Sequence, residues 1–286
     1  MNIALLGLSI LLAAGNNLLL HRFNNRGLRG IGDVLLFNGG VSLIWILVLG
    51  LYGGFALPSG SAIRWGILYG TVQAAMLLSK MEAMCTGPVS VTAFIGCSSM
   101  LLSTGYCVLF RNEPVSVMQG IGFVLMIAAL FLIVSPKGGT AKPSWKYWSV
   151  LFWLCGGACG IVFKMHQASD NAAEITPMMM TAATLSAVLF ALSAVIFAGR
   201  QQHGLPRVPR SAWGYLLAAG VASCLYNRLN IGLAGELPGV LFFPGFNGAV
   251  ILISSLVGAL FFGEKLRRSQ IVGLAIGMGA LVLLAL

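Results

Sequence analysis

Long, continuously apolar runs follow one another along almost the whole chain, separated by short polar connections. A helix needs about 20 mainly apolar residues to cross the hydrocarbon core of a bilayer. Strands of a transmembrane barrel would alternate apolar and polar residues, which these runs do not. The pattern predicts an all-α membrane protein with ten transmembrane helices. They are expected near residues 2–21, 33–52, 64–84, 89–110, 116–134, 147–168, 176–197, 211–234, 239–262 and 269–286.

The composition supports this class of protein. Of 286 residues, 58% are hydrophobic and 8% are charged, against about 25% charged in an average soluble domain. The net charge of +10 comes from short basic clusters between the apolar runs, as in the loops of membrane proteins. We therefore expect membrane lipids around the protein and no nucleic-acid partner.

No sequence motif indicates catalysis. The chain has no HExxH, GxSxG or P-loop, and its six cysteines lie in or beside apolar runs without metal-ligand spacing. We expect no enzyme activity, no cofactor and no metal. Residues 155–160 read Cys-Gly-Gly-Ala-Cys-Gly, a small face that would let two helices approach closely.

An internal repeat is the most informative feature. Residues 103–122 resemble residues 254–273 under a shift of 151 positions, and we assign two five-helix halves, 1–138 and 139–286. Because five is odd, the second half must enter the membrane from the opposite side. Inverted repeats of this kind are typical of secondary transporters, whose substrate site lies near the bilayer midplane between the halves. The shift pairs Phe110 with Phe261, Glu113 with Glu264, Gln119 with Gln270 and Gly122 with Gly273.

The repeated motif is Phe-x-x-Glu in a loop, followed by Gln-x-x-Gly at the start of the next helix. It resembles the EamA-type branch of the drug/metabolite transporter superfamily, over essentially the whole chain. The first copy departs from the family, since residues 111–114, Arg-Asn-Glu-Pro, replace the usual Gly-Glu pair. The resemblance implies a ten-helix transporter, often an exporter of amino acids or small metabolites, with alternating access between its halves. For Glu113 and Glu264 we expect a structural role, capping or pairing that fixes the loop and holds the N-terminus of the next helix.

The basic residues predict the orientation in the membrane. If the N-terminus were cytoplasmic, only Arg64 and Arg111 would lie in cytoplasmic connections. The positive-inside rule therefore places both termini outside, in a multi-pass protein of the inner cell membrane, although relatives in the superfamily are usually described with termini inside. The opposite connections hold Arg22, Arg26, Arg29, Lys137, Lys142, Lys146, Arg200, Arg207, Arg210, Lys265, Arg267 and Arg268.

Polar residues inside the apolar runs are the candidate site residues, because burying them in a membrane is costly. Arg228 is the sharpest, and its partner is either a carboxylate such as Glu82 or the carboxylate or phosphate of the cargo. Lys80 and Glu82 are candidates for ion pairing or for coupling to protons, whereas Lys164 and His166 are expected to snorkel. Pro244 is expected to bend or break its helix, or to be tolerated as a kink. The candidate substrate-binding residues are Arg228, Tyr226, Asn227, Asn16, Asn17, Asn38, Gln73, Asn247 and Trp153.

The sequence as a whole favours a secondary transporter, an exporter of small metabolites such as amino acids, acting as a monomer or weak homodimer. Two alternatives stay open: a flippase for a lipid or lipid-linked phosphate, and a multidrug or cation exporter. Cation–proton antiport through a mid-membrane glutamate is disfavoured, because the first run offers only Asn16 and Asn17. We also hypothesise that Arg228→Gln abolishes transport.

Overall fold

The computed structural model describes residues 2–24, 31–55, 57–134, 141–200, 208–262 and 267–286. Within these ranges every regular element is a helix, and each expected run coincides with helical structure. The elements are α1 (Asn2–Asn24), α2 (Ile31–Gly53), α3 (Gly60–Thr86), α4 (Val89–Ser98), α5 (Met100–Phe110), α6 (Val117–Val134), α7 (Trp145–Gln167), α8 (Ile175–Arg200), the short η1 (Arg210–Ala212), α9 (Trp213–Glu236), α10 (Gly239–Phe262) and α11 (Arg268–Ala285).

Eight helical segments of the described chain are long and apolar enough to cross a membrane. They are α1, α2, α4 with α5, α6, α7, α8, α10 and α11. The two long helices outside this set, α3 and α9, carry charged and amide side chains such as Lys80, Glu82 and Arg228. Many large apolar side chains are exposed, among them Leu47 and Val195. Such a surface suits contact with lipid, and the protein is an all-helical membrane protein.

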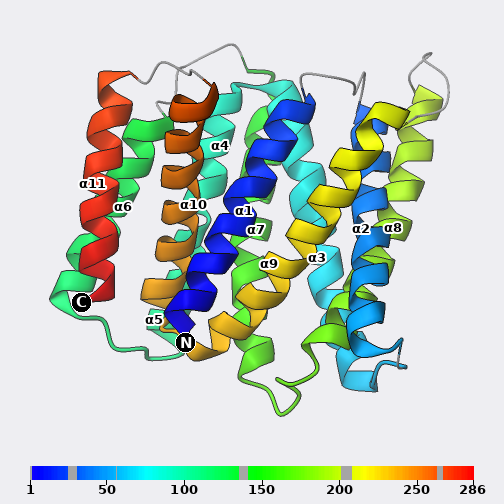
Figure 1. Ribbon diagram of the computed structural model, residues 1–286, viewed down its shortest axis with the longest axis horizontal. Coiled ribbons are helices and arrows are strands. Elements are labelled where there is room, and N and C mark those ends of the chain that lie inside the picture. Colours follow the sequence, from blue (N-terminus) through cyan, green and yellow to red (C-terminus); the bar gives the residue numbers. More distant parts are fainter. Residues whose placement is uncertain (1, 25–30, 56, 135–140, 201–207, 263–266) are drawn as a thin grey trace.

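The helices run up and down through one bundle (Figure 1). The pair α2 and α8 forms one end of its long axis and the pair α6 and α11 the other, while α1 packs on α9 and α3 on α7 between them. Helix α1 rises from the lower end of the view, where both termini lie, and α7 descends. Helices α1 and α7 therefore cross the bundle in opposite directions.

The fourth predicted span is two helices rather than one. Helices α4 and α5 meet at Ser99, where the backbone N–H of Ser99 bonds to Gly96 O (3.2 Å) and that of Leu102 to Ser99 O (3.0 Å). These hydrogen bonds join residues three apart, as in a 3-10 helix, and they tighten the helical turn locally. By contrast, α10 passes through Pro244 as one continuous helix, so a break at Pro244 is not observed.

Glycines let neighbouring helices approach closely. A Cβ on Gly157 of α7 would lie 2.4 Å from Leu102 Cβ of α5, and Ser103 Oγ donates to Gly157 O at 2.9 Å. The predicted close approach along residues 155–160 is confirmed. A Cβ on Gly70 of α3 would lie 2.8 Å from Ala182 O of α8. These contacts hold the centre of the bundle together.

Candidate functional site

A cavity of about 380 Å³ lies between the helices, bounded by α1, α2 and α3 to α5 from the first half of the chain and by α7, α9 and α10 from the second. Most of the residues singled out from the sequence line it, although they come from five different helices. The lining includes Asn16, Asn17, Asn38, Gln73, Lys80, Tyr226, Asn227 and Asn247. A volume of this size suits a small molecule.

Three of the residues predicted to bind substrate or to couple transport do not line this cavity: Arg228, Trp153 and Glu82. The guanidinium of Arg228 instead lies over the ring of Tyr52, 4.3 Å from its centroid, and Arg228 Nε donates to Thr176 Oγ1 at 3.4 Å. No ion pair joins Arg228 to a carboxylate of the described residues, Glu82 included. Glu264 lies outside the described residues.

The cavity amides have a common orientation. Asn38, Asn227 and Asn247 each donate through Nδ2 to the backbone carbonyl four residues earlier, at 2.8, 2.9 and 2.8 Å. A carbonyl can only accept, so the donating atom in each case is the nitrogen. Each amide therefore keeps its oxygen as an acceptor and one further N–H as a donor.

Polar contacts connect the two halves across the cavity wall. Tyr69 Oη donates to Asn227 Oδ1 at 3.2 Å, and Trp45 Nε1 donates to Ser223 Oγ at 2.8 Å. Ser9 Oγ donates to Asn230 Oδ1 at 2.6 Å. Because these groups satisfy one another, they fix the relative position of α1, α2 and α3 against α9.

Trp45, Tyr69, Ser223 and Asn230 line the cavity but were missed in the sequence. Spacing could have found two of them, since Ser223, Asn227 and Asn230 recur at intervals of four and three on one face of α9. Trp45 and Tyr69 have no such signal. Aromatic residues are common in apolar runs, and only the folded arrangement shows that these two face a cavity.

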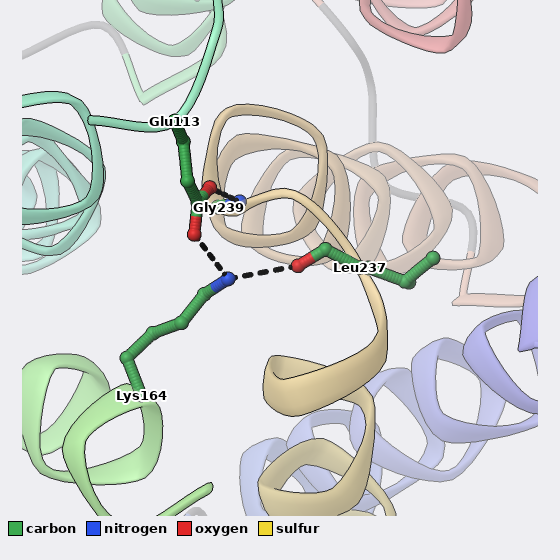
Figure 2. Close-up of polar contacts among 4 residues, drawn as sticks. All are labelled: Glu113, Lys164, Leu237 and Gly239. Carbon is green, nitrogen blue, oxygen red and sulfur yellow. Dashed lines mark hydrogen bonds and ion pairs between the residues drawn. The ribbon is translucent and has the colours of Figure 1, made fainter. Parts of the chain in front are cut away.

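The connection between α5 and α6 lies at the lower end of the bundle, where the termini also lie (Figure 1). There Glu113 contacts residues of the second half (Figure 2). Its Oε1 lies 2.7 Å from Lys164 Nζ of α7, and Lys164 Nζ also donates to Leu237 O at 2.9 Å. The other carboxylate oxygen accepts the backbone N–H of Gly239 at the start of α10. An acidic group at a helix N-terminus is stabilised by the unpaired N–H groups and the helix dipole.

Two expectations need correction here. Lys164 and His166 do not snorkel, since both are buried, and for Lys164 the reason is that Glu113 and the Leu237 carbonyl satisfy its amine inside the protein. Glu113 does cap and pair, as expected. It caps α10 of the other half, however, whereas the next helix, α6, is capped by Ser116, whose Oγ accepts from Gln119 N at 3.1 Å.

The two halves use equivalent glutamines in the same way. Gln119 Oε1 accepts the backbone N–H of Ser116 at 3.2 Å, and Gln270 Oε1 accepts that of Arg267 at 2.9 Å. Both pairs are related by the shift of 151 positions found in the sequence. Each glutamine satisfies an N–H at the start of its helix, α6 or α11.

No group of three potential metal-ligating side chains is present in the part of the chain that the structure describes. No protein-family profile matches the chain, and no curated protein sequence matches it. A solved structure described only as "Crystal structure of protein" superposes with a TM-score of 0.75 at 16% identity, over 99% of this chain and 95% of the other. At that identity the likeness shows a shared fold, and nothing more.

Proposed function

We propose that the protein is a secondary transporter that carries a small metabolite through the central cavity, as a member of the EamA-type drug/metabolite transporters. The observation that carries this proposal is the cavity itself. It gathers amides, tyrosines and a lysine from both halves of the chain within an apolar bundle. Polar side chains at this depth are costly and are commonly kept for a substrate pathway.

We further propose ten membrane crossings in two inverted halves, 1–138 and 139–286. This adds α3 and α9 to the eight apolar segments and counts α4 with α5 as one. Helix contacts support the symmetry: α3 packs on α7 and on α8, while its counterpart α9 packs on α1 and on α2. The matching roles of Gln119 and Gln270 support it as well.

In this proposal the two halves rock about the cavity to expose it alternately to either side. Glu113 and Lys164 hold the lower end closed, and the buried aromatic residues Tyr69, Phe242 and Phe243 lie along that part of the lining. Asn17, also in the lining, is exposed in the upper half of α1. The conformation is then one that faces the upper end.

We propose that the upper end is cytoplasmic and that both termini lie outside. The exposed basic residues of the described ranges near the upper helix ends are Lys142, Lys146, Arg210, Arg267 and Arg268, against Arg64 and Arg111 near the lower ends. A basic excess on the cytoplasmic side is the general pattern in multi-pass proteins.

We propose a soluble cargo rather than the lipid cargo of a flippase. An apolar recess lined by α2, α8 and α9 residues such as Leu43, Val188 and Trp213 shares no lining residue with the polar cavity. A lipid that slides its headgroup along the protein would need the polar and apolar surfaces to be continuous. We therefore favour transport of a soluble metabolite.

The test is counterflow in proteoliposomes preloaded with candidate solutes, including amino acids and organic acids. We expect Asn38→Leu and Asn247→Leu to reduce exchange strongly, because each removes an amide oxygen from the cavity. Trp153→Leu is the matched control, an intramembrane substitution outside the cavity lining, and should keep its activity. Exchange that is equally fast in all three variants, or no exchange of any solute by the folded protein, would refute the proposal.

A further inference from the structure

Lys80 stands apart from the rest of the cavity. Lys80 is the only charged residue among the described residues that line the cavity. The other lining residues carry amide, hydroxyl, aromatic or apolar side chains. No hydrogen bond or ion pair connects its amine to another residue within the ranges that the structure describes. A cation at membrane depth without a protein partner points to a ligand that supplies the negative charge.

The amides offer the complementary kind of group. Asn38 and Asn247 each donate one of their two Nδ2 hydrogens to a backbone carbonyl, which holds the amide in place, and their Oδ1 atoms remain as acceptors. Asn16 is buried, and its Oδ1 has no hydrogen-bond partner. A buried acceptor without a donor is costly, so these oxygens favour a ligand that carries a hydroxyl or another donor.

Charge balance decides which donor fits best. A carboxylate bound to Lys80 neutralises the charge of the described lining, whereas the ammonium of an amino acid would add a second positive charge that no described acidic residue of the lining can balance. Burying a charge without a counter-charge is far more costly than burying a hydroxyl that donates one hydrogen bond. A hydroxy acid neutralises Lys80 and donates its hydroxyl hydrogen to an amide oxygen, whereas a zwitterion leaves the cavity with a net positive charge.

The remaining wall suits a compact apolar body. Trp45, Phe242 and Phe243 contribute rings to a cavity of about 380 Å³. Aromatic and apolar surface of this kind binds a hydrocarbon group, while a few polar side chains fix the orientation of the ligand.

We propose that the cavity binds a monoanionic hydroxy acid, with its carboxylate on Lys80 Nζ and its hydroxyl on an amide oxygen. It binds this acid more tightly than the amino acid of the same carbon skeleton. The inference rests on the proposed transport function, because it identifies the class of cargo.

Matched ligand pairs test it directly, since the two members differ only in hydroxyl against ammonium. The purified protein is titrated with lactate and alanine, 2-hydroxyisocaproate and leucine, and 3-phenyllactate and phenylalanine, and each Kd is derived from ligand-induced thermal stabilisation. We expect at least one hydroxy acid to bind about tenfold more tightly than its amino acid, the range expected for one well-made polar interaction.

Variants separate a binding role from a structural one. Lys80→Met should weaken hydroxy-acid binding by about ten- to a hundredfold. The Kd of the amino acid divided by that of the hydroxy acid should then fall to one or below. Lys80→Arg retains the charge and should retain the preference. Lys146→Met, which removes an exposed lysine near the same end of the bundle, should change neither Kd. Asn16→Leu should weaken the binding of 2-hydroxyisocaproate until its Kd approaches that of 4-methylpentanoate, which has the same carbon skeleton without the hydroxyl.

The inference is overturned if the amino acids bind as tightly as the hydroxy acids, if Lys80→Met leaves the preference unchanged, or if no pair binds. Counterflow in proteoliposomes separates this failure from that of the proposed function. Exchange of amino acids that is insensitive to Lys80 would refute the hydroxy-acid preference and keep the transporter, whereas absence of any exchange would refute the transporter.

Discussion

Glu113 of the first half and Lys164 of the second half form a largely buried ion pair, with 2.7 Å between Oε1 and Nζ. The side chains are 18% and 8% exposed, so neither charge is well hydrated. Each has a further partner, Gly239 N–H for the carboxylate and Leu237 O for the amine. The loop after α5 is thereby tied to both α7 and the start of α10.

Breaking this pair should be strongly destabilising. Glu113→Gln or Lys164→Met leaves one buried charge unpaired, which typically costs about 3–5 kcal/mol. The double variant should cost less than the sum of the two single variants, because it leaves no uncompensated charge. Unfolding free energies in detergent would measure the coupling. Glu236→Gln, which removes an exposed carboxylate at the same end, is the control and should be close to neutral, and strictly additive effects would contradict the pairing.

The same pair should also control access to the cavity. Cys159 lines the cavity and can report on it once the other five cysteines are replaced. In the proposed orientation it should react with a membrane-impermeant thiol reagent from the cytoplasmic side. Combining this reporter with Glu113→Gln and Lys164→Met should increase its reactivity from the side of the termini. If reactivity from that side does not change, the pair holds the loop without acting as a closure.

Close helix packing gives an independent prediction about stability. Gly70→Ala places a methyl group 2.8 Å from Ala182 O and 2.9 Å from its Cα, and backbone atoms cannot yield as a side chain can. We expect a loss of about 1–3 kcal/mol. Gly105→Ala is the matched control, because nothing lies within 4 Å of its added methyl group, and alanine favours a helix over glycine by about 0.5–1 kcal/mol. Equal melting temperatures for the two variants would show that α3 and α8 do not pack as described.

The sequence was a good guide to the helices because membrane spans depend on long apolar runs, which are local. All ten expected ranges coincide with helical structure, and the amides and Tyr226 do line one cavity. The break at Ser99 could not be read, since serines are also tolerated inside continuous helices. The snorkelling expected of Lys164 was wrong because its partner, Glu113, is 51 residues away along the chain.

Arg228 illustrates the limit of the sequence argument most clearly. Burial cost showed that it needs a partner, but not which one, and the structure places Tyr52 and Thr176 beside it. We now expect Arg228→Gln to change the KM of exchange by less than about twofold and to lower stability by about 0.5–1 kcal/mol through loss of the contact with the ring. Lys80→Met should instead change the KM of exchange strongly and leave stability nearly unchanged. Loss of exchange in a stable Arg228→Gln variant would restore Arg228 as a cargo-binding residue.

The glutamine equivalence offers the most direct test of the internal repeat. Gln119→Leu and Gln270→Leu each remove the acceptor for a helix-start N–H, at Ser116 and Arg267, and should each cost about 1 kcal/mol. Gln270 should cost more, because its Nε2 also donates to Ile133 O of the first half at 3.0 Å. Denaturation of both variants and of the double variant would decide this. Because the two caps lie on different helices, the double variant should be near additive, apart from the shared contact of α6 with α11. If Gln119→Leu lowers the free energy of unfolding and Gln270→Leu does not, the two glutamines are not equivalent in stabilising the fold, despite the repeat in the sequence.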